Sequence, residues 1–122
     1  MKTKLTAFIF FSVALMISCD KQRARKLSGT YHCRVEQESF DMVSLESDTI
    51  FFQDLIVEQQ GKEVKVLGTT IHIDSLWKEK EYYESGFNSS IRVLFREDSV
   101  FIEKYNGGQG GYTYWYYKGL KK

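Results

Sequence analysis

Apolar and polar residues alternate along much of the chain after residue 27, with the period of two that is typical of a half-buried β-strand. The pattern is clearest at residues 30–36, where Tyr31, Cys33 and Val35 share one face. It returns at residues 91–95. Further apolar runs predict strands at residues 49–59, 63–67, 71–73, 100–102 and 112–117.

Groups of turn-forming residues separate these predicted strands. Tight turns are expected at residues 60–62 and 97–98. The apolar positions change parity across Gly68, which predicts a bulge or a tight turn there. Residues 40–46 are expected to form a loop and residues 106–111 a flexible glycine-rich loop; residues 74–88 could hold a short helix or an excursion.

The succession of strands and turns predicts an all-β domain, an antiparallel meander of six to eight strands. Neither a helical heptad nor the spacing of βαβ units competes with this interpretation. The chain contains no proline, a residue that often protects exposed sheet edges. Closure into a small barrel, or curling into a sandwich, would remove those edges.

The first residues have the order of a bacterial secretory signal. Lys2 and Lys4 are basic, residues 5–17 are almost entirely apolar, and Ser18 and Cys19 follow. The apolar run is too short for a membrane-spanning helix, which needs about 20 residues. The sequence therefore predicts an exported protein.

Met16-Ile17-Ser18-Cys19 resembles the lipobox of bacterial lipoproteins, with Met16 at the position where leucine is usual. The resemblance implies that Cys19 receives a diacylglyceryl group and becomes the first residue of the mature protein. Such lipoproteins carry fatty acyl chains such as palmitate and are anchored in the cell envelope, here expected at the outer membrane. The alternatives are an ordinary signal peptide with a chance cysteine and an uncleaved membrane helix.

The chain then divides into a signal peptide (residues 1–18), a lipidated cysteine with a basic tether (residues 19–26) and a β-barrel domain (residues 27–122). The basic run at residues 21–26 is either a solvated tether or a segment attracted to anionic lipid headgroups. Removal of Lys2 and Lys4 with the signal changes the net charge from +1 to −1. The domain therefore has no strongly basic field, and nucleic acid is not expected as a partner. With Cys19 lipidated, Cys33 has no disulfide partner and is expected to be a buried, inert thiol.

Several segments together resemble a group of small Bacteroidota lipoproteins of unknown function with a lipocalin-like barrel. They are Leu27-Ser28-Gly29-Thr30-Tyr31, Gly68-Thr69-Thr70-Ile71-His72-Ile73-Asp74-Ser75, the glycine loop at residues 107–111 and Tyr117-Lys118-Gly119-Leu120-Lys121. Gly29-Thr30-Tyr31 is also similar to the Gly-x-Trp start of lipocalins. The resemblance implies an up-and-down barrel and transfers no catalytic residues.

Tyr31-His32-Cys33 resembles the Tyr-x-Cys strand of the membrane-bound inhibitors of C-type lysozyme, which are also small β-barrel lipoproteins. Ser85-Gly86-Phe87 matches a fragment of their lysozyme-contacting motif. In those inhibitors the cysteine is disulfide-bonded, whereas Cys33 has no partner. The resemblance implies an alternative function, inhibition of a lysozyme-type hydrolase.

The polar residues give no set that predicts an enzyme or a cofactor. His72 and Asp74 share a strand face, but two side chains are fewer than a zinc site requires. Glu79, Glu81 and Glu84 form a local charged run that is expected to be solvated. We expect no catalytic residue, no metal and no cofactor.

Tyr112, Tyr114, Trp115 and Tyr116 are the candidate ligand-binding residues, because tyrosine and tryptophan rings offer apolar faces with a polar edge. Alternation places the three tyrosines on one strand face, opposite Trp115 and Tyr117. Core packing is the alternative role for these rings. We therefore expect a monomeric, membrane-anchored binding or accessory module for a small apolar ligand, a glycan or a protein.

Overall fold

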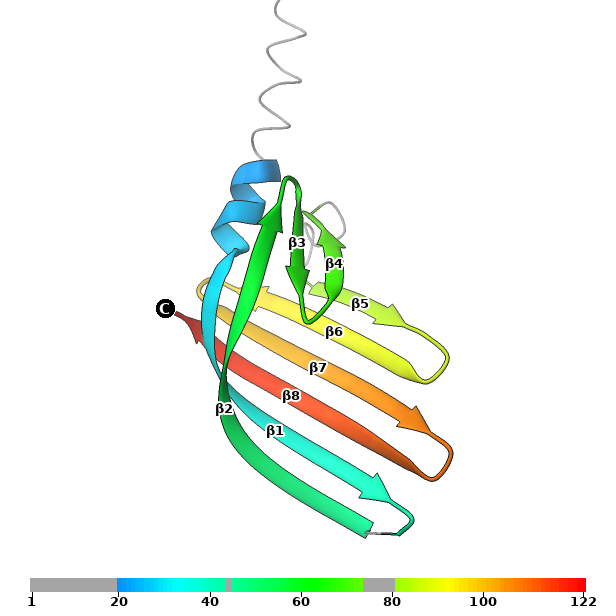
Figure 1. Ribbon diagram of the computed structural model, residues 1–122. Helices are drawn as coiled ribbons and strands as arrows, with labels where there is room; N and C mark the ends of the chain where they lie inside the picture. Colours follow the sequence, from blue (N-terminus) through cyan, green and yellow to red (C-terminus); the bar gives the residue numbers. More distant parts are fainter. Residues whose placement is uncertain (1–19, 44, 74–80) are drawn as a thin grey trace, which may run out of the picture.

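The computed structural model describes residues 20–43, 45–73 and 81–122, and in them the protein is all-β (Figure 1). Eight antiparallel strands form one nearly closed, barrel-shaped sheet, and residues 20–27 form a short helix at one end of it. The predicted antiparallel meander is confirmed. The strands are β1 (Gly29–Asp41), β2 (Leu45–Gln60), β3 (Glu63–Val66), β4 (Thr69–His72), β5 (Glu81–Ser85), β6 (Ser89–Arg96), β7 (Ser99–Gly108) and β8 (Gly111–Lys121).

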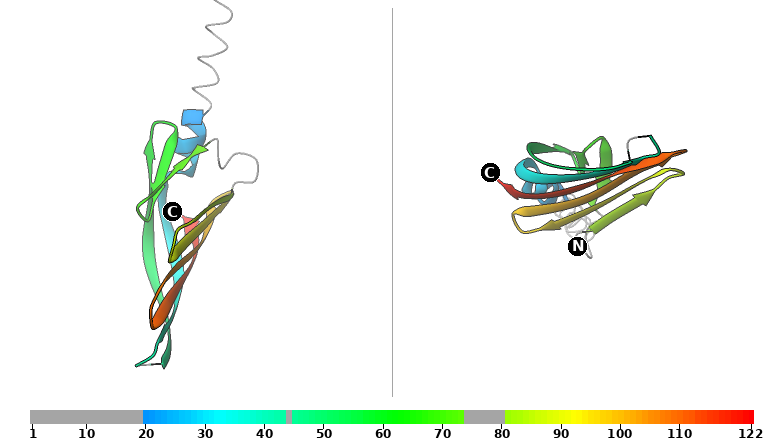
Figure 2. Two further views of the ribbon diagram at one scale, coloured as in Figure 1. Left: turned by 90° about the vertical axis from the view of Figure 1, so that its right-hand side faces the viewer. Right: turned by 90° about the horizontal axis from the view of Figure 1, so that it is seen from below.

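The order of strands in the sheet is β4-β3-β2-β1-β8-β7-β6-β5. Strands β1 to β4 pair in sequence order, and so do β5 to β8. The first and last strands also pair with each other, with Val35 opposite Tyr117. This pairing of β1 with β8 joins the two halves of the sheet at its centre, and β4 and β5 are its two edges (Figure 2).

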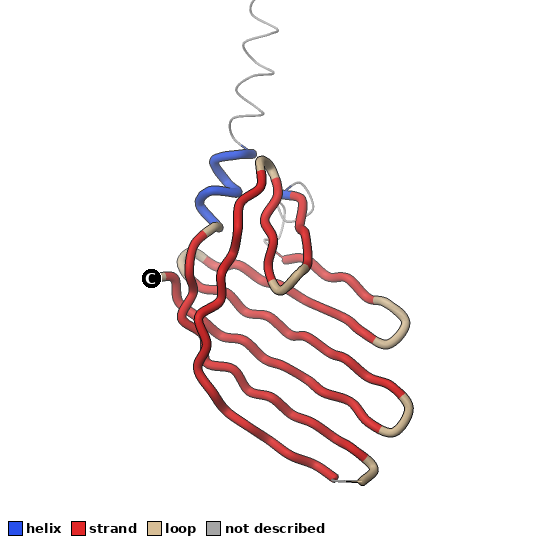
Figure 3. Tube along the Cα trace, in the orientation of Figure 1, coloured by secondary structure: helices blue, strands red, loops and turns tan. Residues whose placement is uncertain are grey.

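Tight turns link the strands at the predicted places. Residues 61–62, 67–68 and 97–98 form turns in the structure (Figure 3). Leu67 and Gly68 both have positive φ, 49° and 77°, as a two-residue hairpin turn of type I′ requires. The turn resets the strand parity, so that Val64 and Ile71 lie side by side on the same face.

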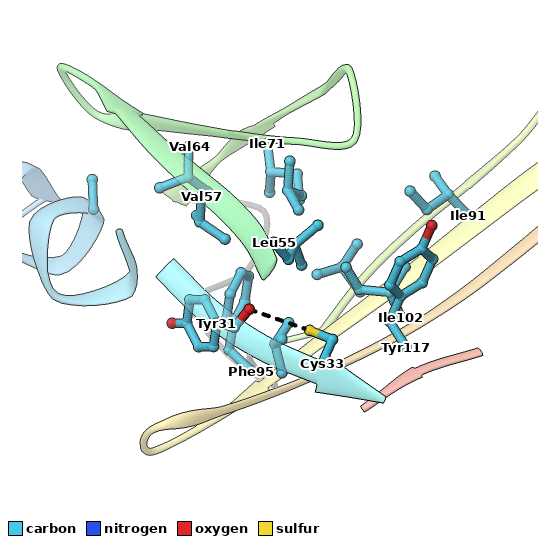
Figure 4. Packing of buried hydrophobic residues seen from close by; sticks show 14 of the residues in the cluster. Tyr31, Cys33, Leu55, Val57, Val64, Ile71, Ile91, Phe95, Ile102 and Tyr117 are labelled. Atoms are coloured by element: carbon cyan, nitrogen blue, oxygen red, sulfur yellow. Dashed lines mark hydrogen bonds between the residues drawn. The ribbon is translucent and has the colours of Figure 1, made fainter. Parts of the chain in front are cut away.

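The core lies at the end of the sheet next to the helix. Tyr31, Cys33 and Val35 from β1 pack there with apolar side chains from the other strands (Figure 4). Ala24 of the helix is fully buried in the same cluster. The Tyr31 hydroxyl donates a hydrogen bond of 2.8 Å to the Leu27 carbonyl oxygen, which ties β1 to the helix.

Three predictions of local structure are wrong. The loop predicted at residues 40–46 is too long, because β1 runs to Asp41, residues 42–43 form a turn and β2 begins at Leu45. Residues 106–111 are not a flexible loop, because β7 continues to Gly108 and only residues 109–110 form the turn into β8. Part of the segment 74–88 is neither helix nor excursion, because residues 81–85 form the edge strand β5.

The remainder of that segment, residues 74–80, lies outside the described residues. So do the signal segment and Cys19. The described part of the predicted basic tether is helical, with Lys21, Arg25 and Lys26 exposed and Ala24 buried against the barrel.

Candidate binding surface

The apolar side of the sheet changes along its length. Near the helix, the inner face carries the core, and we call this part the closed half. Farther along, the strands extend as a sheet whose inner face is mostly polar; we call this the distal half, residues 37–41, 45–53, 104–108 and 111–116 (Figure 1). The polar inner residues there are Gln37, Ser39, Asp41, Ser47, Thr49, Gln53, Lys104, Asn106 and Thr113.

The outer face of the distal half is aromatic. Strand register brings five rings together on it, Phe40, Tyr105, Tyr112, Tyr114 and Tyr116. We call these five residues the aromatic ladder. Three come from β8 at a spacing of two, and the other two come from the strands on either side.

The rings of the ladder are in direct contact. The centroid of Tyr114 lies 4.7 Å from that of Tyr105, 5.5 Å from that of Tyr112 and 6.0 Å from that of Tyr116. Phe40 stacks on Tyr112 with centroids 5.7 Å apart. These separations fall in the range of favourable aromatic pairs, so the rings support one another on the outside of the sheet.

Further apolar side chains are exposed on β2, separated from the rings of β8 by Arg34 and Glu36 of β1. Ile50 and Phe52 lie on the same outer face as the ladder, and Phe52 is 71% exposed. Met42 and Val43, in the hairpin between β1 and β2, are also exposed. Single exposed apolar residues are ordinary, but a contiguous set is typical of an interaction surface.

Carboxylates surround the ladder. Glu38 lies directly opposite Tyr114, and Glu36 and Glu103 flank Tyr116 from the two neighbouring strands. The pKa of Tyr116 is raised, first by partial burial and then by the nearby Glu38, Tyr114, Glu103 and Glu36. Acidic side chains on both neighbouring strands therefore lie beside Tyr114 and Tyr116, and one of them, Glu36, is paired with Arg34.

The three candidate tyrosines share a face, as the alternation predicts, and Trp115 lies on the other side of the sheet. Trp115 is half-buried against the core, with the Lys104 ammonium 5.5 Å from its ring centroid. Tyr117 is buried in the core. Sequence reasoning missed Phe40 and Tyr105, which only the strand register brings beside the three tyrosines.

Two shallow hollows adjoin the ladder. One, of about 560 Å³, is formed by the strand ends at the distal tip, including Phe40, Tyr112 and the turn at residues 107–111. The other, of about 250 Å³, lies between Arg34, Glu36, Phe101, Glu103, Tyr116 and Lys118. Both are open to solvent, which suits a protein surface better than an enclosed small molecule.

A hollow of about 390 Å³ lies between the β3–β4 turn and strands β5 to β7. Its lining includes Leu67, Thr69, Glu84, Lys104 and Asn106. Polar and charged groups predominate over apolar ones in this lining. It does not offer the apolar chamber that a hydrophobic guest requires.

Of the predicted pair His72 and Asp74, only His72 lies among the described residues. His72 is exposed and its Nδ1 lies 3.2 Å from Glu63 Oε1, while Asp74 lies outside the described residues, as does Glu79. Glu81 pairs with Arg92 across the β5–β6 hairpin, and Glu84 accepts a hydrogen bond from the Tyr82 hydroxyl at 2.8 Å. Within residues 20–43, 45–73 and 81–122, no three histidine, cysteine or carboxylate side chains lie close enough to hold a metal ion.

His32 and Cys33 point to opposite faces, as alternation predicts. His32 is exposed and its Nδ1 lies 2.5 Å from Asp54 Oδ1. Cys33 is fully buried, and burial raises the pKa of its thiol to about 11, with a smaller contribution from Asp54. The predicted burial of Cys33 is confirmed, and a buried protonated thiol is a poor nucleophile.

Comparisons with protein families, curated proteins and solved structures give no match for this chain. The part of the chain that the structure describes contains no helix long and apolar enough to cross a bilayer.

Proposed function

We propose that this protein is a lipid-anchored lipoprotein of the bacterial cell envelope that acts as a non-enzymatic binding module, docking a protein partner on the outer face of its distal half. The anchor is a diacylglyceryl group on Cys19. The binding residues are Tyr112, Tyr114 and Tyr116, together with Phe40 and Tyr105. Trp115 supports the sheet from the opposite side.

The observation that carries the proposal is the aromatic ladder itself. Five rings lie, together with Ile50 and Phe52, on a face that no second layer of the described chain covers. Core packing does not require them, since the core lies on the other face and at the other end of the sheet. Aromatic side chains are enriched at the centres of protein interfaces.

The anchor is tested in a bacterium that processes lipoproteins. The full chain and its Cys19→Ser variant are expressed with radiolabelled palmitate, and the envelope fraction is separated. The parent should incorporate label and remain with the membranes, whereas the variant should lose both. Equal labelling of the two chains would contradict the anchor.

Inhibition of a lysozyme-type hydrolase is a second candidate. One observation favours it: Phe87 in Ser85-Gly86-Phe87 is fully exposed, at the tip of the β5–β6 hairpin. A protruding ring of this kind could enter the cleft of an enzyme. Lysis assays with the full chain in neutral detergent test it; inhibition that is lost in Phe87→Ser supports it, and no inhibition at large molar excess removes it.

A further inference from the structure

The carboxylates beside the aromatic ladder indicate which kind of partner would bind to its rings. We infer that the partner presents a cationic, lysine- or arginine-bearing protein segment to the ladder. This inference rests on the proposed binding function and deepens it by naming the class of partner.

Like charges face each other beside the ladder. Glu38 of β1 lies directly opposite Asp48 of β2 on one side and Tyr114 of β8 on the other. Opposed carboxylates on adjacent strands are destabilising. A cation placed over Tyr114 would relieve this repulsion and would also gain from the negative face of the ring.

The described chain does not supply that cation itself. No ion pair or hydrogen bond in residues 20–43, 45–73 and 81–122 joins Glu38 or Asp48 to a basic side chain. The basic residues nearest on the outer face have other partners. Arg34 pairs with Glu36, Arg92 with Glu81, and the Lys118 ammonium lies 5.7 Å from the Phe101 ring centroid.

Other occupants fit the same surface less well. A second copy docking face to face would bring its own Glu38 and Asp48 against these carboxylates. An anionic bilayer would be repelled for the same reason, although exposed Met42 and Val43 could otherwise enter lipid. A cationic protein matches both the rings and the charge.

The position of the ladder also separates it from the anchor. The helix that follows Cys19 lies at the closed end of the barrel, and the β1–β2 and β7–β8 hairpins lie at the other end (Figure 1). β1 alone has 13 residues, a length of about 40 Å at the usual rise of a strand. The ladder is therefore presented away from the membrane that holds the lipid.

The test uses the full chain in neutral detergent micelles, with a synthetic oligolysine peptide as probe and binding measured by calorimetry at low and physiological salt. Glu38→Gln with Asp48→Asn should weaken binding by about three- to tenfold, as loss of two surface charge contacts predicts. The matched control, Glu58→Gln with Glu97→Gln, removes the same charge outside the distal half and should bind like the parent. Tyr114→Phe should retain binding and Tyr114→Ser should lose about threefold, since only the ring face is required.

Each remaining outcome overturns the inference. The first is that the control pair weakens oligolysine binding as much as Glu38→Gln with Asp48→Asn does, and the second is that oligoglutamate binds more tightly than oligolysine. The third is that the protein binds phosphatidylglycerol vesicles and not the peptide. The fourth is concentration-dependent self-association of the protein through the ladder. Binding of a neutral N-acetylglucosamine oligomer at Tyr114, without oligolysine binding, would overturn the cationic partner but leave the binding module standing. Failure of the Cys19 labelling experiment would remove the anchor without affecting either result.

Discussion

The closed half and the distal half belong to the same four central strands, yet they place apolar side chains on opposite faces. β8 shows this along its length: Tyr117 and Gly119 face the core, whereas Tyr112, Tyr114 and Tyr116 face outward. The closed half is stabilised by burial of a contiguous cluster. The distal half is stabilised by strand pairing and by rings that contact one another at the surface.

The difference separates folding from recognition. The closed half has a filled core on one side and charged residues such as Arg34, Asp54 and Arg96 on the other. Ile56 and Leu120 are exposed apolar exceptions on that outer side. In the distal half the rings contribute little to a core, so the stability of the fold does not explain their presence there.

Removing one phenylalanine from each half should give the largest difference in the free energy of unfolding between the two halves. Phe95→Ala should lower the free energy of unfolding by about 3–5 kcal/mol, because the ring is 1% exposed and its loss leaves a cavity. Phe52→Ala removes the same group from a site that is 71% exposed. It should change the free energy of unfolding by less than about 0.5 kcal/mol. Urea denaturation of both variants measures the two values, and similar losses would contradict the division into halves.

Two glycines give a second and smaller contrast. A Cβ at Gly119 would overlap Cys33 Sγ and lie 3.0 Å from the His32 carbonyl oxygen, whereas a Cβ at Gly108 would meet nothing within 4 Å. Gly119→Ala should therefore destabilise the protein by about 1–3 kcal/mol, the usual range for overpacking. Gly108→Ala is the matched control and should be close to neutral; if it costs as much, the packing difference is not the cause.

The smallest effect concerns charge on the outer face. Lys122 Nζ donates to Asp54 Oδ2 at 2.8 Å, and His32 contacts the other oxygen; these hydrogen bonds lower the pKa of Asp54 below its ordinary 3.8. A carboxyl with a lowered folded pKa contributes stability above its ordinary pKa, and this is lost as pH falls through the folded value. When the pH falls below 3.8, the free energy of unfolding should therefore decrease slightly less in Asp54→Asn than in the parent.

Asp48→Asn in the distal half provides the comparison, because no basic side chain in the described ranges pairs with Asp48. Urea midpoints at pH 3 and pH 6 measure both variants. If Asp54→Asn keeps the pH dependence of the parent unchanged, the hydrogen bonds to Lys122 and His32 do not stabilise the fold.

Most of the fold follows from the sequence, because alternation and turn residues are local signals. The turn at Gly68 follows from the parity of Val64 and Ile71. Strand β5 does not, because Tyr82 and Tyr83 are adjacent and an edge strand in a polar segment shows no alternation. The two rejected loops have one cause: residues 40–46 and 106–111 are polar or glycine-rich, and their strand structure comes from pairing with neighbours rather than from their own propensity.

The candidate surface was only partly predictable. Spacing of two on β8 identifies Tyr112, Tyr114 and Tyr116 as one face and Trp115 as the other. Phe40 depends on strand register, which one sequence does not reveal. A signal for the change of face was nevertheless present. The apolar residues of β1 have odd numbers as far as Val35, whereas Phe40 has an even number, and no bulge lies between them.

Hydroxyl-radical footprinting of the full chain, read residue by residue by mass spectrometry, tests the central claim most directly. Phe52 and Tyr112 should be oxidised rapidly, and Tyr31 and Phe95 should be protected until the protein unfolds. Protection of Tyr112 and Phe52 equal to that of Tyr31 in the free protein would show that the aromatic face is covered, and would contradict the account.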